Sequence, residues 1–130
     1  MDYFIAKKIK NETFESLDQK VRDELKKEGF GVLTEIDVQK TLKEKINADF
    51  HKYKILGACN PAFAYRALTA DDKIGSFLPC NVVIQETNEG ELELMIFDPA
   101  STMMAMGNPE LADLSGEVRE KLIRVMENID

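Results

Sequence analysis

One stretch in the middle of the chain constrains the fold more than any other. It contains two apolar segments, Tyr53–Pro61 and Leu78–Ile84, and each places a cysteine, an asparagine and a proline at one of its ends. Asn60-Pro61 is a helix-start signal, because asparagine caps free amides and proline suits the first helical position. Pro79 is typical of the start of a strand, where its missing donor costs least. We therefore predict a strand that turns into a helix, followed by a second strand.

Apolar patterns on either side of this stretch predict the remaining elements. Period-two alternation predicts strands, and apolar residues at steps of three and four predict helices. Thr13 and Gly29 mark the ends of the first helix, Asp37 caps a short one, and Ser115 is expected to cap the last. We expect strands at residues 3–9, 30–36, 53–58, 82–87 and 91–97, and helices at residues 14–27, 38–46, 61–68, 99–104 and from 116 onward.

Three of these helices have an apolar stripe that predicts their buried side. The stripe of the first helix is Phe14, Leu17, Val21 and Leu25. The stripe of the last helix is Val118, Leu122, Val125, Met126 and Ile129. In the short helix after Asp37, the side chains expected to face inward are Val38, Leu42 and Ile46.

The order of the elements predicts the fold class. Strict βαβ repetition is missing, and residues 82–87 and 91–97 flank a short glycine-containing loop that is typical of a β-hairpin. The strands alternate as half-buried strands do, which favours antiparallel pairing. We therefore expect residues 1–130 to form a single α+β domain, with a largely antiparallel sheet and helices packed on one face.

Charge and composition exclude several partners. The 130 residues include 17 Lys and Arg against 24 Asp and Glu, a net charge of −7. A chain this acidic lacks the clustered cations that bind nucleic-acid phosphates or an anionic membrane leaflet. Its first residues lack the layout of a secretory signal, and no apolar run approaches the ~20 residues of a membrane span. Because it has only two cysteines, we expect a reduced, cytoplasmic protein.

The two cysteine-bearing segments also carry a family resemblance. Together with Phe97-Asp98-Pro99 they resemble the family known as "domain of unknown function 302", and the likeness extends from Gly29 through the closing helix. The resemblance implies a bacterial or archaeal protein with a TATA-box-binding-protein-like α+β topology, often as a dimer. It does not imply DNA binding, because the charge is unsuited and a shared fold does not transfer function. It brings no established activity.

The two cysteines are the side chains most suited to nucleophilic, redox or metal-binding chemistry. Cys59 precedes a predicted helix N-terminus, where the helix dipole and free amides stabilise a thiolate. Such a thiolate would suit a nucleophile, a redox centre or a soft-metal ligand. Alternatively, Cys59 is a small apolar residue at a tight corner, and Cys80, which alternates with Val82 and Ile84, belongs to the core. The sequence leaves both interpretations open.

A soft-metal site is one hypothesis that these cysteines raise. Cys59, Cys80 and His51, the only histidine, supply three ligands within one chain or across a dimer interface. Spacings typical of zinc sites, such as CxxC, are absent. A methionine cluster offers thioethers for Cu(I), or else fills gaps in the core or at a dimer contact. Its members are Met103, Met104 and Met106.

These observations favour a small ligand- or metal-binding module without a catalytic mechanism of its own. Its pocket would lie where the Tyr53–Pro61 and Leu78–Asn81 corners converge, and no cofactor is identified. Two alternatives stay open: a thiol-dependent enzyme or redox protein that uses Cys59, and a homodimeric protein-interaction domain. Asn60 and Asn81 have competing roles as a helix cap and a turn residue. The residues expected to line the pocket are Cys59, Asn60, Pro61, Pro79, Cys80 and Asn81.

Overall fold

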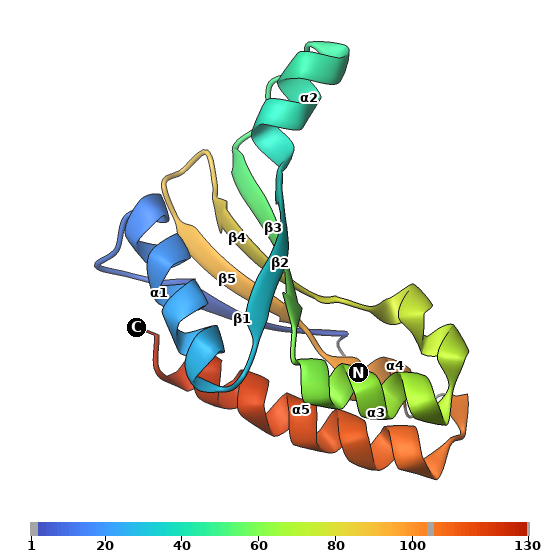
Figure 1. Cartoon of the computed structure of the whole chain (residues 1–130). Coiled ribbons are helices and arrows are strands. Elements are labelled where there is room, and N and C mark those ends of the chain that lie inside the picture. The colour runs from blue at the N-terminus through green and yellow to red at the C-terminus, as the bar shows by residue number, and fades with distance from the viewer. Residues whose placement is uncertain (1–2, 104–105, 130) are drawn as a thin grey trace.

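Five antiparallel strands form one sheet in the order β1-β5-β4-β3-β2, in a computed structural model that describes residues 3–103 and 106–129 (Figure 1). The strands are β1 (Phe4–Ile9), β2 (Gly31–Asp37), β3 (Lys52–Cys59), β4 (Cys80–Glu86) and β5 (Leu92–Phe97). The helices are α1 (Phe14–Lys27), α2 (Val38–Ile46), α3 (Pro61–Ala70), the 3₁₀ helix η1 (Asp72–Phe77), α4 (Pro99–Met103) and α5 (Pro109–Glu127). The predicted α+β fold with an antiparallel sheet is confirmed.

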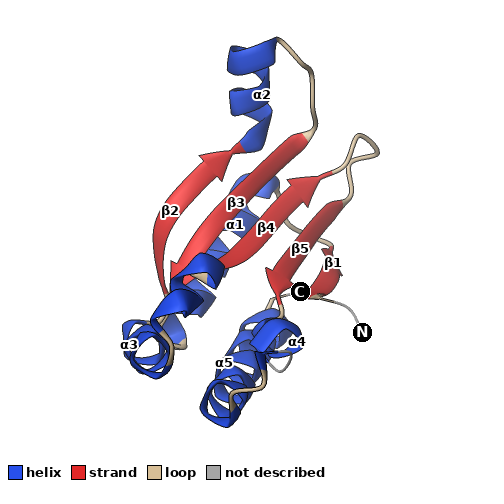
Figure 2. Cartoon of the chain, turned by 90° about the vertical axis from the view of Figure 1, so that its right-hand side faces the viewer, coloured by secondary structure: helices blue, strands red, loops and turns tan. Residues whose placement is uncertain are grey.

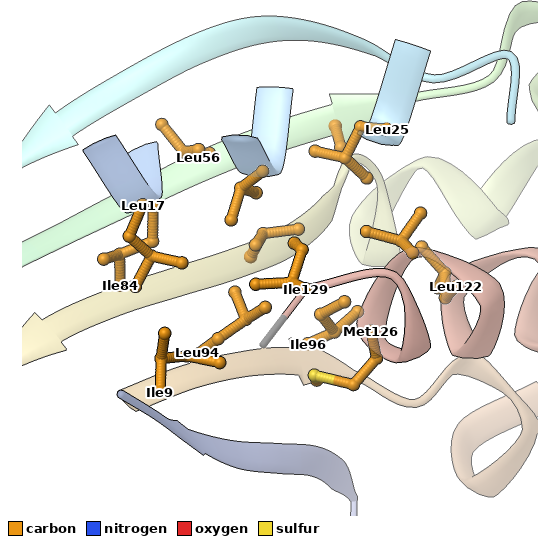
Figure 3. Close-up of a cluster of buried hydrophobic side chains, with 14 of the residues drawn as sticks. Ile9, Leu17, Leu25, Leu56, Ile84, Leu94, Ile96, Leu122, Met126 and Ile129 are labelled. Atoms are coloured by element: carbon orange, nitrogen blue, oxygen red, sulfur yellow. The ribbon is translucent and has the colours of Figure 1, made fainter. Parts of the chain in front are cut away.

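The main core lies between one face of the sheet and two helices, α1 and the C-terminal part of α5. Alternate residues of the strands point into it, as the period-two pattern predicts. Figure 3 shows these side chains meeting residues of both helices. The apolar stripes predicted for the first and last helices are confirmed, since every member of both is buried. Central members of this main cluster are Leu17, Leu25, Leu56, Ile84, Leu94, Ile96, Leu122 and Ile129.

A group of four charged side chains also holds α1 to the sheet. Asp18 of α1 accepts hydrogen bonds from Arg22 at 2.7 Å and from Lys54 of β3 at 2.6 Å. Glu35 of β2 completes the group, at 2.7 Å from Arg22 and 2.9 Å from Lys54. Each cation therefore bridges two carboxylates, and the group joins α1, β2 and β3.

A second, smaller cluster lies beyond one end of the strands. The prediction of helices packed on one face holds for α1 and part of α5, whereas α3, η1, α4 and the start of α5 gather at this end (Figure 2). Their apolar side chains pack against one another instead of against the sheet. The buried members of this end cluster are Ala67, Ile74, Met103, Leu111 and Leu114.

Helix α2 projects from the opposite end of the sheet (Figure 1). Its start and end follow the sequence signals, because Asp37 caps it and Asn47 closes it in the left-handed conformation, with φ of 54°. The predicted inward stripe is wrong: no residue of α2 is buried, and Ile46 is 69% exposed. The helix starts where β2 leaves the sheet, so its stripe has no core layer to face.

The start of α5 also differs from the prediction. The helix begins at Pro109, and the Asn108 side chain accepts hydrogen bonds from the amides of Glu110 and Leu111. Ser115 is not a cap: it is 1% exposed inside the helix, and its hydroxyl donates to the Ala112 carbonyl at 2.8 Å. Asn108-Pro109 repeats the Asn60-Pro61 signal, which is the stronger start.

Smaller differences lie elsewhere along the chain. Residues 69–75, which the sequence predicts to form a turn, instead contain the end of α3 and the start of η1. Helix α4 is described through Met103, whereas Met104 lies outside the described residues. Within the described ranges, no helix combines the length and the apolar character needed to cross a membrane.

The sheet face opposite α1 has none of the described helices over it (Figure 2). One residue from each strand forms a line across this face, because the pairings align Ala6 with Met95, Met95 with Val83, Val83 with Ile55, and Ile55 with Ile36. All five are apolar, and each is at least partly exposed. We refer to this line as the apolar row.

Candidate ligand-binding pocket

The first predicted corner forms where β3 runs into α3. Asn60 caps α3, accepting a hydrogen bond from the Phe63 amide at 3.4 Å, and Pro61 occupies the first turn. The other end of the Asn60 amide donates to the Glu28 carbonyl at 3.4 Å. Both ends of the Asn60 side chain are therefore engaged with backbone, which matches the capping role and leaves no amide group directed at a ligand.

The second predicted corner forms where η1 runs into β4. The Leu78–Pro79 peptide bond is cis, and β4 begins at Cys80. Because Cys80 pairs with Ala58, the residue before Cys59, the sheet places the two cysteine-bearing segments side by side. Asn81 points the other way, since it is exposed and borders a separate surface hollow with Phe97.

The two corners together line one apolar pocket, which we call the corner pocket. It lies between the main cluster, represented by Phe30 and Val118, and the end cluster, represented by Ala67 and Leu114. Its free volume is about 30 Å³. That space exceeds the roughly 10–15 Å³ that one water molecule needs, but few polar groups adjoin it. Residues of the corners that line it are Cys59, Asn60, Leu78, Pro79 and Cys80.

Four of the six predicted pocket residues thus come together here. Cys59, Asn60, Pro79 and Cys80 line the corner pocket, whereas Pro61 is exposed at the start of α3 and Asn81 faces the other side of the sheet. Sequence reasoning missed Phe63, Ala64 and Ala67 of α3 and Met103 of α4. The step of four from Phe63 to Ala67 and the step of three from Ala64 to Ala67 could have indicated a buried side of α3.

The two thiols differ in their surroundings. Both cysteines are free; Cys59 is half-buried and Cys80 is buried. Burial, with a smaller effect from the neighbouring Cys59, raises the pKa of the Cys80 thiol to about 11. Cys80 is therefore protonated at neutral pH, and it lacks the low pKa of a reactive thiolate.

His51 is not brought to the cysteines within one chain. It precedes β3, at the opposite end of this strand from Cys59, and eight residues of strand span roughly 26 Å. Its Nε2 lies 2.7 Å from Oε1 of Gln85, and its ring stacks on Phe50. Among residues 3–103 and 106–129, no three His, Cys, Asp or Glu side chains gather as they would around a metal ion.

The methionine cluster divides between two environments. Met103 is buried and lines the corner pocket, whereas Met106 is exposed. Met104 lies outside the described residues. The structure therefore brings one thioether to the same pocket as both thiols.

Phe63 connects the pocket to the surface. It packs against both clusters, and two cations lie over its ring. The guanidinium carbon of Arg66 is 5.4 Å from the ring centroid, and Nζ of Lys121 is 6.0 Å from it. Arg66 also pairs with Glu117 at 3.0 Å and Lys121 with Glu28 at 4.0 Å, so both cations are held by carboxylates next to the ring.

Comparisons with known proteins agree with this architecture. A family model described as "Domain of unknown function DUF302" matches residues 5–129. Among solved structures, the chain is similar to the crystal structure of an uncharacterized conserved protein DUF302 from Bacillus stearothermophilus, with 26% sequence identity and a TM-score of 0.90. The match covers 100% of both chains. The comparison with curated proteins finds no match.

Proposed function

Because this chain belongs to the DUF302 family, whose description assigns no activity, we propose a function from its own geometry: it binds a small apolar ligand in the corner pocket. The family resemblance of the two cysteine-bearing segments is confirmed by the family match. The observation that carries the proposal is the convergence of both segments on one apolar pocket between two hydrophobic clusters.

The chemistry of the lining defines the class of ligand. The pocket is surrounded by aromatic, aliphatic and sulfur-containing side chains, and ligand pockets in proteins are predominantly apolar with few polar groups. With about 30 Å³ free, the pocket accepts a small apolar group. A ligand as large as benzene requires Phe63 to rotate outward. A reduced, cytoplasmic setting suits this function, because the thiols that line the pocket then remain unmodified.

The proposal is tested by methyl-group NMR during a titration with benzene as the probe. We expect saturable shifts of the methyl groups of Ala64, Ala67 and Met103. Ala64→Leu fills the pocket and should abolish these shifts, whereas Ala62→Leu, at an exposed position of the same helix, should leave them unchanged. An absence of saturable shifts at these methyl groups would overturn the proposal.

A second candidate function, self-association into a homodimer, is favoured by the apolar row. Five neighbouring strands each place an apolar side chain on an uncovered face, and contiguous exposed apolar patches are typical of interaction surfaces. Further exposed apolar side chains extend the surface toward α2. They include Ile46 of α2 and Phe50, in the loop between α2 and β3.

Sedimentation equilibrium tests this second candidate. Val83→Lys places a charge at the centre of the apolar row, and we expect the dimer dissociation constant to rise by at least tenfold, or about 1.4 kcal/mol. Gln19→Lys adds the same charge on the exposed side of α1 and should leave association unchanged. A wild-type chain that stays monomeric at millimolar concentration would exclude the homodimer.

A further inference from the structure

We propose that the corner pocket is a Cu(I) site in which Cys59, Cys80 and Met103 are the ligands. The inference goes beyond the proposed function, because it assigns a metal ion, and not an apolar molecule, to the same pocket. This set of ligands differs from the one predicted from the sequence, which was Cys59, Cys80 and His51. The thioether of Met103 takes the place of the distant His51 imidazole.

Three separate elements contribute the three sulfur-containing residues to this pocket. Cys59 ends β3, Cys80 begins the neighbouring strand β4, and Met103 ends α4. All three line the corner pocket. The pairing of Ala58 with Cys80 sets Cys59 and Cys80 on adjacent strands, and Met103 is a buried member of the end cluster.

The ligand chemistry selects Cu(I) over other metals. Thiolate and thioether sulfur are soft ligands that favour Cu(I), whereas Ca²⁺, Mg²⁺ and Mn²⁺ prefer oxygen. A structural zinc site needs four ligands, and the described residues gather no three His, Cys, Asp or Glu side chains at one point. Two thiolates and one thioether, in contrast, form a suitable set of ligands for Cu(I).

Metal binding would change the charge of the pocket. Cu(I) displaces one proton from each thiol, so that two protons pass to solvent and a complex with a net charge of −1 remains. The N-terminus of α3, whose cap Asn60 directly follows Cys59, favours this charge. No electron transfer is involved, because copper enters and stays as Cu(I).

The test is an anaerobic titration of the reduced chain with Cu(I) against a chromogenic Cu(I) chelator. We expect one Cu(I) per chain, with affinity about 100-fold lower in Cys59→Ala and in Cys80→Ala and about tenfold lower in Met103→Leu. Met106→Leu is the matched control at an exposed methionine and should bind as the wild type does. Circular dichroism of each metal-free variant verifies folding, and Cys59→Ser provides a second variant at the less buried thiol.

Two further readouts sharpen the test. Because two protons are released, the apparent Cu(I) affinity should rise roughly 100-fold per pH unit below the thiol pKa values, against roughly tenfold for a single thiolate. X-ray absorption at the copper edge should show three sulfur neighbours. Equal affinity in the wild type and the Cys59→Ala/Cys80→Ala double variant would overturn the site, and so would wild-type affinity in Met103→Leu. Benzene binding without Cu(I) binding would overturn this inference alone, whereas Cu(I) binding without benzene binding would overturn only the apolar-ligand proposal.

Discussion

Gly57 shows at the scale of single residues how closely the sheet packs around Pro79. A Cβ atom at Gly57 would overlap Oγ1 of Thr34 on β2 and would lie 2.8 Å from Cγ of Pro79. The register that pairs Thr34 with Gly57 creates this contact. A glycine here lets the second corner approach β3.

We expect Gly57→Ala to lower the free energy of unfolding by about 1–3 kcal/mol, because the added methyl group forces Thr34 and Pro79 apart. Urea denaturation followed by circular dichroism measures the change. Gly31→Ala on β2 is the matched control, since a Cβ there meets no atom within 4 Å. Equal stabilities of the two variants would show that the contact around Gly57 is looser than the structure indicates.

Cys80 makes the stability of the fold sensitive to high pH. Its pKa is raised from 9.0 to about 11, mainly by burial and then by Cys59. A raised folded-state pKa means that the stabilisation is complete below the unfolded pKa near 9 and is lost as the pH rises through 11. Above pH 9 the unfolded chain releases a proton that the folded chain retains.

We therefore expect the wild type to lose about 2 kcal/mol between pH 8 and pH 11 through this thiol, a loss that Cys80→Ala should lack. The measurement is the urea midpoint as a function of pH. Cys59→Ala is the control: it should retain most of the alkaline loss, because burial is the larger cause of the raised pKa. If Cys80→Ala loses as much stability at alkaline pH as the wild type does, other titrating groups cause the loss.

At the scale of elements, α1 depends on charge as well as on its apolar stripe. Burial alone would raise the pKa of the Asp18 carboxyl, but hydrogen bonds from Lys54 and Arg22 outweigh burial and hold that pKa below its ordinary value. A lowered folded-state pKa contributes stability above the unfolded pKa of about 3.9. That stability is lost as the pH falls through the folded-state pKa.

Asp18→Asn should therefore flatten the acid side of the stability profile, although the variant is less stable than the wild type at pH 7. The free energy of unfolding between pH 5 and pH 2 tests this expectation. Asp49→Asn is the control, because that side chain is 91% exposed and pairs with Lys43 near the tip of α2. If the free energy of unfolding of Asp18→Asn falls with acid in parallel with that of the wild type, the charged group does not hold α1 to the sheet.

At the scale of the whole molecule, two apolar clusters meet at one side chain. Phe63 contacts both the main cluster beneath the sheet and the end cluster of α3, η1, α4 and α5. The corner pocket lies at the same junction, where packing between the two clusters is incomplete. Coupling of the clusters and access to the pocket therefore depend on the same residue.

Phe63→Ala should cost about 2–3 kcal/mol, the lower part of the range for phenylalanine truncation, because the ring is only half-buried. It should also enlarge the pocket and strengthen benzene binding. Thermal unfolding and the methyl-group titration measure the two effects. Tyr65→Ala, at a side chain that is 75% exposed in the same helix, should change neither.

The sequence by itself determined the elements and much of their capping. Local signals act over a few residues, so the Asn60-Pro61 cap, the α1 stripe and the strand alternation could be read directly. The same local logic predicts that the last helix starts at Ser115, although Asn108-Pro109, seven residues earlier, is the stronger signal. Four of the six predicted pocket residues could be located because both segments end in strand boundaries.

Only the tertiary structure decided which elements face each other. A helical stripe predicts that a helix has an apolar side, but not that a layer exists to cover it, and for this reason Ile46 of α2 is exposed. Strand register, which depends on contacts distant in sequence, set Cys80 beside the Cys59 corner and His51 at the far end of β3. Packing between the two clusters brought Met103 into the corner pocket, since nothing in the local sequence relates residue 103 to residue 59.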